Sequence, residues 1–231
     1  NISGFTIRNS SRYSDSGIKI YYSYHVVISN CDISNNVFGI EIDHSGYNNI
    51  LNCGITSNSN DGIYLTHSSS NTISNCSISG RGSGIDLDSS WYNTISNCYI
   101  NLNNAGGIEM DYSSYNTISN CDITSNKYWG IDMDNSNSNS ISNCDISNNV
   151  FGIYMTHSDS NSISNCDITS DDKINIGLYN SSSNTIFSCN IIDSDHGIVL
   201  FGDSDSNSIS NCTITSNKNE GIVLCDYSYI F

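Results

Sequence analysis

A repeat of 22 or 23 residues runs through nearly the whole chain and constrains its fold more than any other feature. Each copy resembles residues 71–78, Asn-Thr-Ile-Ser-Asn-Cys-Ser-Ile, followed by a Gly-Ile-x-Leu segment such as 84–87. The cysteines that keep this register are Cys31, Cys53, Cys76, Cys98, Cys121, Cys144, Cys166, Cys189 and Cys212. A fixed period in this range is typical of stacked repeats, in which each unit buries its apolar side against its neighbours. The sequence therefore predicts a single solenoid domain over residues 1–231.

Within each repeat, apolar and polar residues alternate. Cys76 and Ile78 lie on one face of their segment, as Ile85 and Leu87 do on theirs, and this alternation is strand geometry. The step of three residues from Ile73 to Cys76 breaks the alternation, so the chain must bend there. We therefore expect an all-β fold of about ten coils, with three short strands per coil and continuous internal columns of Ile, Cys and Leu.

Asparagine occupies two fixed positions of the repeat. One set lies two residues before the first isoleucine: Asn48, Asn71, Asn93, Asn116, Asn139, Asn161, Asn184 and Asn207. The other set directly precedes the cysteine: Asn30, Asn52, Asn75, Asn97, Asn120, Asn143, Asn165 and Asn211. Asparagine tolerates left-handed backbone angles, and stacked asparagines can hydrogen-bond from coil to coil. Both sets are therefore expected at the corners of the coils.

These repeated positions, Asn-x-Ile-x-x-Asn-x-x-Ile and then Gly-Ile-x-Leu-x-x-Ser, resemble the right-handed parallel β-helix repeat family. The form is that of NosD-like proteins and of archaeal cell-surface proteins, and the resemblance covers nearly the whole chain. It implies a single-stranded right-handed parallel β-helix. It selects no single function, because this architecture carries lyases, hydrolases, epimerases, adhesins and structural proteins. The cysteine in nearly every coil departs from the family, where asparagine or an aliphatic residue is common.

The chain is strongly acidic, with 23 acidic against 7 basic side chains and a formal net charge of −16. Nucleic acids and anionic membranes are polyanions, so we expect neither as a partner. No apolar run approaches the ~20 residues that a membrane-spanning helix needs. The chain begins inside a repeat and without methionine, which we interpret as a processed chain or a segment of a longer protein. An extracellular or cell-surface location is expected.

The cysteine column has three interpretations. Small buried thiols are the simplest, because free cysteine is among the most buried residue types. Disulfides between adjacent coils are a second, although stacked Cβ atoms would stay near the ~4.8 Å strand spacing, beyond the usual ~3.8 Å. A copper(I) column is a third, which suits soft thiolates but which desolvation opposes. Cys225 breaks the register on an outward position and is the candidate for an intermolecular disulfide.

Three consecutive Gly-Ile-x-Leu/Met segments carry carboxylates at both outward positions. The six residues are Asp86, Asp88, Glu109, Asp111, Asp132 and Asp134. Like charges across a ladder repel, so this cluster predicts a solvated acidic face, a hard-cation site for Ca²⁺, or catalytic carboxylates. Inverting glycosidases need two carboxyl groups roughly 6.5–9.5 Å apart, a separation that stacked coils offer. None of the arginines Arg8, Arg12 and Arg81 falls in these segments, which disfavours β-elimination of uronates.

Histidines and aromatic residues gather after the Gly-Ile-x-Leu segments. His44, His67 and His157 occupy the same repeat position, and His44 and His67 lie in adjacent coils where their rings can stack. We expect exposed corner residues rather than a metal site. The aromatic residues of these corners include Tyr22, Tyr24, Tyr47, Trp91, Tyr92, Tyr112 and Tyr115. They suit either stacking on sugar rings or contacts between molecules.

The uniform repeat and the absence of recognisable capping repeats favour a non-enzymatic extracellular structural or surface protein. Such a protein would self-associate through its coil ends into filaments or a surface layer, and it would require no cofactor. One alternative is a carbohydrate-active enzyme or glycan-binding module that uses the acidic strand face. Another is a metal-handling module for calcium or copper.

Overall fold

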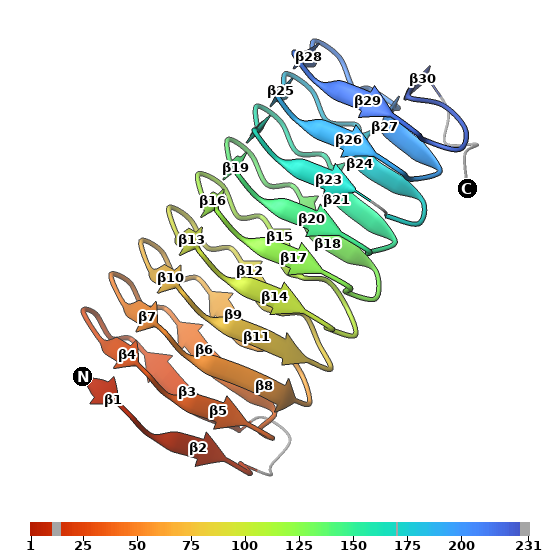
Figure 1. Ribbon diagram of the computed structural model, residues 1–231. Coiled ribbons are helices and arrows are strands. Elements are labelled where there is room, and N and C mark those ends of the chain that lie inside the picture. Colours follow the sequence, from red (N-terminus) through yellow and green to blue (C-terminus); the bar gives the residue numbers. More distant parts are fainter. Residues whose placement is uncertain (11–14, 170, 227–231) are drawn as a thin grey trace.

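The computed structural model describes residues 1–10, 15–169 and 171–226. Its strands wind into a right-handed parallel β-helix of about ten coils (Figure 1), with three ten-stranded parallel sheets as its faces. Each coil contributes one strand to each sheet, and we call the sheets A, B and C in the order in which the chain enters them. The predicted fold is therefore confirmed.

The strand bounds follow the repeat closely. Sheet A consists of β1 (Ile2–Ser3), β4 (Val27–Ser29), β7 (Asn49–Leu51), β10 (Thr72–Ser74), β13 (Thr94–Ser96), β16 (Thr117–Ser119), β19 (Ser140–Ser142), β22 (Ser162–Ser164), β25 (Thr185–Phe187) and β28 (Ser208–Ser210). Sheet B consists of β2 (Thr6–Arg8), β5 (Asp32–Ser34), β8 (Gly54–Asn58), β11 (Ser77–Gly80), β14 (Tyr99–Asn101), β17 (Asp122–Thr124), β20 (Asp145–Ser147), β23 (Asp167–Thr169), β26 (Asn190–Ile192) and β29 (Thr213–Thr215). Sheet C consists of β3 (Ser16–Tyr21), β6 (Phe38–Asp43), β9 (Ile63–Thr66), β12 (Ile85–Asp88), β15 (Ile108–Asp111), β18 (Trp129–Asp134), β21 (Phe151–Thr156), β24 (Ile174–Tyr179), β27 (His196–Phe201) and β30 (Ile222–Cys225).

The interior is built from columns of identical or similar side chains. Ile73 pairs in register with Ile95, and Ile78 with Ile100, so each isoleucine lies on its counterpart in the next coil. These isoleucines are fully buried. Burial of one such side chain stabilises a fold by about 1.5–3 kcal/mol. One coil alone has no partner for these residues, and for this reason stacking drives folding.

The cysteine column is a column of buried free thiols. Cys121 is 2% exposed, and its Sγ donates to the carbonyl of Ser119 at 3.3 Å and to that of Ile95 at 3.9 Å. All ten cysteines are free, so the disulfide interpretation of the column does not apply. Cys225 ends β30 on the outward side, where it is the register partner of Phe201. Its intermolecular disulfide stays a prediction.

The two sets of asparagine have different roles at the corners. Asn75 and Asn120, which precede cysteines, adopt left-handed backbone angles with φ of 54° and 52°. Asn93 and Asn116 belong to the other set and form a buried ladder. The Asn116 Oδ1 accepts from the Asn93 backbone N–H at 2.8 Å and from the Asn93 Nδ2 at 3.2 Å, while its own Nδ2 donates to the Ser90 carbonyl at 3.0 Å.

Replacing Asn116 with alanine is expected to destabilise the protein by about 2–4 kcal/mol, because it leaves the backbone N–H of Asn93 and the carbonyl of Ser90 unpaired at a buried corner. Asn120→Gly is the matched control, since glycine accepts the left-handed angle at this exposed corner. The measurement is the thermal or urea unfolding midpoint of both variants. Equal midpoints for the two variants would contradict the ladder's role.

A second buried ladder, at the corner between sheets B and C, was not predicted. It runs through Asn103, Asn126, Asn149 and Asp171, with the backbone N–H of each residue donating to the side-chain oxygen of the next. Coil eight is irregular in sequence as well, because Asn175 stands where its neighbours have glycine. Within the described residues there is no helix able to span a membrane.

Candidate functional site

The outward face of sheet C brings all six predicted carboxylates together. Asp86, Glu109 and Asp132 are direct register partners on β12, β15 and β18. Asp88, Asp111 and Asp134 form a parallel column two residues further along the same strands. We call these six residues the acidic face. Because adjacent strands lie ~4.8 Å apart, each carboxylate has like charges on both sides or at one side.

Two members of the acidic face hold their protons unusually tightly. Burial, together with the charges of neighbouring carboxylates, raises the pKa of Asp86 to about 8 and that of Asp132 to about 7. The pKa of Asp111 is raised for the same reasons. Burial disfavours the charged form, and nearby like charges add to that effect. Around neutral pH the face therefore combines acids that still carry protons with carboxylates beside them.

Glu109 lies between these two acids and is fixed in place. Its Oε1 accepts a hydrogen bond from the backbone N–H of Gly106 at 3.0 Å. A Cβ at position 106 would lie 2.9 Å from this oxygen, so glycine leaves the space that the glutamate side chain needs. The hydrogen bond orients one carboxylate oxygen at the centre of the face.

Asp61 extends the acidic face and was not predicted from the sequence. It precedes β9, is 8% exposed, and accepts the backbone N–H of Ser83 at 2.8 Å. Burial raises its pKa to about 6, and the charge of Glu109 contributes. Asp61 lies outside the Gly-Ile-x-Leu segment, in a loop whose register with the strands only the three-dimensional structure reveals.

Aromatic rings bound the carboxylates on both sides. Tyr64 pairs with Asp86 on β9, and Tyr154 pairs with Asp132 on β21. Each tyrosine contacts a phenylalanine that directly precedes a Gly-Ile pair. Phe38, from the preceding coil, stacks on Tyr64, and Phe151, from the same coil, contacts Tyr154. In both pairs the ring centroids are 5.5 Å apart. Along the helix axis this column reads Tyr-Asp-Glu-Asp-Tyr. The sequence predicted the carboxylates but not their enclosure between two tyrosines.

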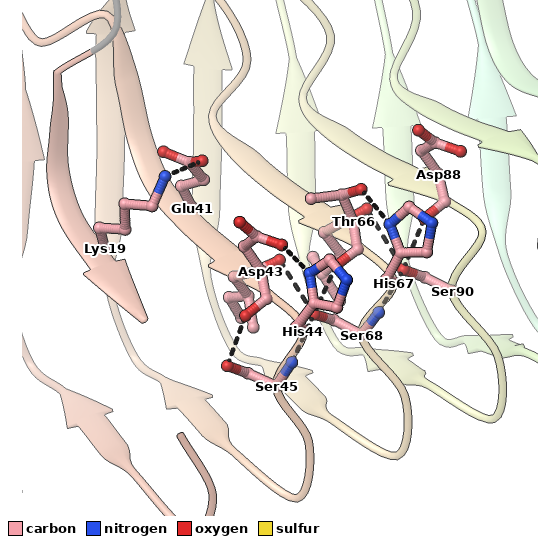
Figure 2. Close-up of polar contacts among 12 residues, drawn as sticks. Lys19, Glu41, Asp43, His44, Ser45, Thr66, His67, Ser68, Asp88 and Ser90 are labelled. Carbon is pink, nitrogen blue, oxygen red and sulfur yellow. Dashed lines mark hydrogen bonds and ion pairs between the residues drawn. The ribbon is translucent and has the colours of Figure 1, made fainter. Parts of the chain in front are cut away.

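The predicted corner histidines lie beside this face (Figure 2). The rings of His44 and His67 stack with centroids 4.8 Å apart, which confirms their predicted stacking. Asp43 pairs with His44, and Lys19 pairs with Glu41 at 2.6 Å. His157 occupies the same corner four coils further on from His67, without another histidine beside it.

The donor set of the acidic face is carboxylate oxygen only, which suits a hard cation such as Ca²⁺ rather than a transition metal. Within the part of the chain that the structure describes, no three His, Cys, Asp or Glu side chains are arranged to hold a metal ion. Calcium at this face stays a prediction. Titration of the protein with Ca²⁺, followed by calorimetry at neutral pH, measures calcium binding directly.

Several solved structures of polysaccharide-related proteins share the fold. The A-module of a mannuronan C-5 epimerase from Azotobacter vinelandii aligns with a TM-score of 0.70 and 14% identity, over 89% of this chain and 65% of that one. Pectate lyase Pel9A aligns with a TM-score of 0.64 and 15% identity, over 94% and 69%. The enzymatically active domain of tailspike protein 2 from bacteriophage CBA120 aligns with a TM-score of 0.71 and 14% identity, over 90% and 39%. The chain thus spans less than two thirds of the epimerase module and of the tailspike domain.

At these identities the structural likeness concerns the fold alone. No curated protein matches the chain in sequence. The sequence does match the family described as "Right handed beta helix region", over residues 1–128, 38–172 and 103–230. These three overlapping matches cover nearly every coil, and the three parallel sheets agree with them. The chain belongs to the right-handed β-helix family.

Proposed function

We propose that this protein is carbohydrate-active and hydrolyses a glycan laid along the outward face of sheet C. The observation that carries the proposal is the column in which Asp86, Glu109 and Asp132 lie between Tyr64 and Tyr154. Carboxylates in pairs, one protonated and one not, are the groups that glycoside hydrolysis needs. Aromatic rings present the flat apolar surfaces on which sugar rings pack.

The roles follow from environment and spacing. Asp86 keeps its proton at neutral pH and is the general acid that protonates the leaving oxygen. Glu109, oriented by Gly106, is the nucleophile that attacks the anomeric carbon. Their strands are ~4.8 Å apart, near the ~5–5.5 Å carboxyl separation of retaining glycosidases. Water then cleaves the glycosyl-enzyme bond, with Asp86 removing a proton from that water. Retention of the anomeric configuration is therefore expected.

The substrate class proposed is a neutral glycan. A uronan would place its own carboxylates against six others, and an arginine or lysine beside them would be needed to offset the repulsion. The one lysine or arginine that the structure describes on the outward strand positions of sheet C is Lys19, which is already paired with Glu41. The similar folds of an epimerase, a pectate lyase and a tailspike domain support a polysaccharide ligand in general.

The test is a panel of neutral glycans and uronans incubated with the purified chain, with release of reducing ends as the readout. Hydrolysis of a neutral glycan with the retained anomer as first product, seen by proton NMR, is the expected result. An inverted product would contradict the pairing of Asp86 with Glu109. Unsaturated products from a uronan would contradict hydrolysis itself, and the absence of turnover across the panel would contradict an enzymatic role.

End-to-end self-association is a second candidate function. In the last described coil, Ile222 and Leu224 point along the interior columns and are 47% and 72% exposed. Exposed apolar residues of this kind favour contact with another molecule. Light scattering over a range of protein concentrations measures it: growth of long particles would support a structural role, and a monomer at every concentration would contradict it.

A further inference from the structure

We propose that His44 and His67 form a surface site for a divalent transition-metal ion, separate from the acidic face. The two residues occupy the same corner of adjacent coils, directly after β6 and β9. Their backbone N–H groups donate to the carbonyls of Thr66 and Asp88 at 3.1 and 3.0 Å, so equivalent hydrogen bonds hold both residues in place. Imidazole nitrogen is the preferred ligand of zinc, copper and nickel.

The Nδ1 atom of each ring is engaged in a hydrogen bond, which leaves the Nε2 atoms for a ligand. The Nδ1 of His44 is held by the Asp43 carboxylate at 2.5 Å, and the Nδ1 of His67 by the Thr66 hydroxyl at 2.9 Å. A hydrogen bond at one imidazole nitrogen directs the metal to the other, and a carboxylate behind the ring raises the basicity of the ligand. Nε2 is therefore the metal-binding nitrogen on each ring.

The rings are nearly parallel, with an angle of 13° between their planes. Tyr22 stacks on the far side of His44, with centroids 4.9 Å apart, and so limits the tilt of the first ring. The Zn–N bond is ~2.0–2.1 Å, so one ion reaches both nitrogens when they lie within about 4 Å of each other. The Nε2 lone pairs lie in the ring planes and run side by side in the present stack, so the exposed His67 ring must turn out of the stack for one ion to bind both nitrogens.

The surface beside the two histidines has a cavity for the ion and negative charges that attract it. Both histidines line a surface cavity of about 290 Å³ together with Tyr24, Tyr47 and Ser69. Water molecules in this cavity complete the coordination, because the protein supplies two ligands. The carboxylates of Asp43 and Asp88 and the net charge of −16 attract cations to this surface.

His157 is the matched control that the chain itself provides. It follows β21 at the same corner, and its backbone N–H donates to the Tyr179 carbonyl at 3.0 Å. Its Nε2, however, contacts the Asn180 side-chain amide at 3.2 Å, and its neighbours at this corner are Asn135 and Asn180. The position is the same, but the second histidine is missing.

The experiment titrates the whole chain with Zn²⁺, which is redox-inactive toward the thiols, and follows the five histidines by two-bond ¹H–¹⁵N correlation NMR. The expected result is one ion per chain, with the Nε2 signals of His44 and His67 shifting together. His44→Ala and His67→Ala should each weaken zinc affinity about tenfold or more in calorimetry, and Asp43→Asn, which removes the carboxylate that orients His44 and attracts the ion, about 10–100-fold. His157→Ala should leave the affinity unchanged.

Three outcomes would overturn the proposal. Zinc binding without a shift of either histidine would place the ion on carboxylates or thiols. Equal effects of His157→Ala and His44→Ala would mean unspecific surface binding. Absence of any binding at millimolar Zn²⁺ would mean that the pair is only a ring stack. None of these outcomes bears on turnover at the acidic face, so the two proposals stand or fall separately.

Discussion

Asp171→Asn is expected to stabilise the protein, with a gain that increases as the pH rises above 4. Asp171 is 1% exposed and takes the place of asparagine in the second ladder. Its Oδ1 accepts from the backbone N–H and the Nδ2 of Asn149, at 2.8 and 3.2 Å. Its Oδ2 has no hydrogen-bond partner. In the preceding rows of the ladder, the Nδ2 of Asn126 and of Asn149 donates to an isoleucine carbonyl at 3.3 Å.

Asparagine restores the missing donor, and a buried unsatisfied group costs about 1–3 kcal/mol. The pH dependence follows from linkage. Burial raises the pKa of Asp171 well above its ordinary value of 3.8, so the folded state binds a proton that the unfolded state has lost. The stability of the wild-type protein therefore falls as the pH rises from about 4 to the folded-state pKa, and the Asp171→Asn variant would not share that fall.

The measurement is the urea midpoint of both proteins at pH 4, 6 and 8. Asp167→Asn is the control, because Asp167 is an exposed carboxylate on neighbouring β23. Asn149→Asp, which introduces a second acid into the ladder, should show the opposite sign. A constant difference between wild type and Asp171→Asn at all three pH values would contradict the linkage, and a loss of stability would contradict the role of the ladder.

Glu109→Gln is expected to lower turnover on the neutral glycan by about 10²–10⁴-fold while raising the unfolding midpoint. Turnover falls because the nucleophile is lost. The midpoint rises because one of the repelling carboxylates is removed from the face, and the charge of Glu109 contributes to the raised pKa of both Asp86 and Asp132. Opposite changes in activity and stability are typical of a functional site.

Asp145→Asn is the control for this variant. Asp145 belongs to another stacked acidic column, on β20 of sheet B, and lies between Asp122 and Asp167. That column is bounded by a tyrosine at one end only, Tyr99, and by Asn190 at the other. Its replacement should leave turnover unchanged. Equal losses of turnover from the two variants would argue against a specific role of sheet C.

The pH profile of turnover provides a separate test of the acid. Asp86 must be protonated to donate, and its pKa is raised to about 8 by burial and by neighbouring carboxylates. Turnover is therefore expected to persist through neutral pH and to fall as the pH rises past about 8. In Asp86→Asn that alkaline decline should disappear together with most of the activity. A decline near pH 5 in the wild type would exclude Asp86 as the acid.

The sequence predicted those features that recur at a fixed offset. The isoleucine and cysteine columns, the left-handed corner asparagines and the six stacked carboxylates each hold one position in the 22- or 23-residue repeat, so stacking alone places them. The stacking of His44 on His67 follows from the same rule. A residue's alignment with its counterparts can be read from the sequence wherever the spacing between coils is constant.

The features that escaped prediction have two causes. The second ladder does hold a fixed offset, because Asn103, Asn126, Asn149 and Asp171 each stand three residues after the sheet B isoleucine, so the repeat contained the signal for it. Asp61 lies further along the segment between sheets B and C, whose length varies from coil to coil, and its bond to Ser83 depends on how that loop folds. The pairing of Asp43 with His44 depends on side-chain rotamers, which no repeat pattern encodes.

The register of sheet C also fixes the distance between the two tyrosines that bound the acidic face. Tyr64 and Tyr154 are four strands apart, a span of about 19 Å at ~4.8 Å per strand. Every coil adds the same increment, and whole coils can be gained or lost by duplication or deletion of one repeat without disturbing the columns on either side. The distance between the rings of Tyr64 and Tyr154 therefore changes only in steps of one strand spacing. A chain with one more repeat between β12 and β18 would place the two rings one strand spacing further apart and would fit a ligand longer by that amount.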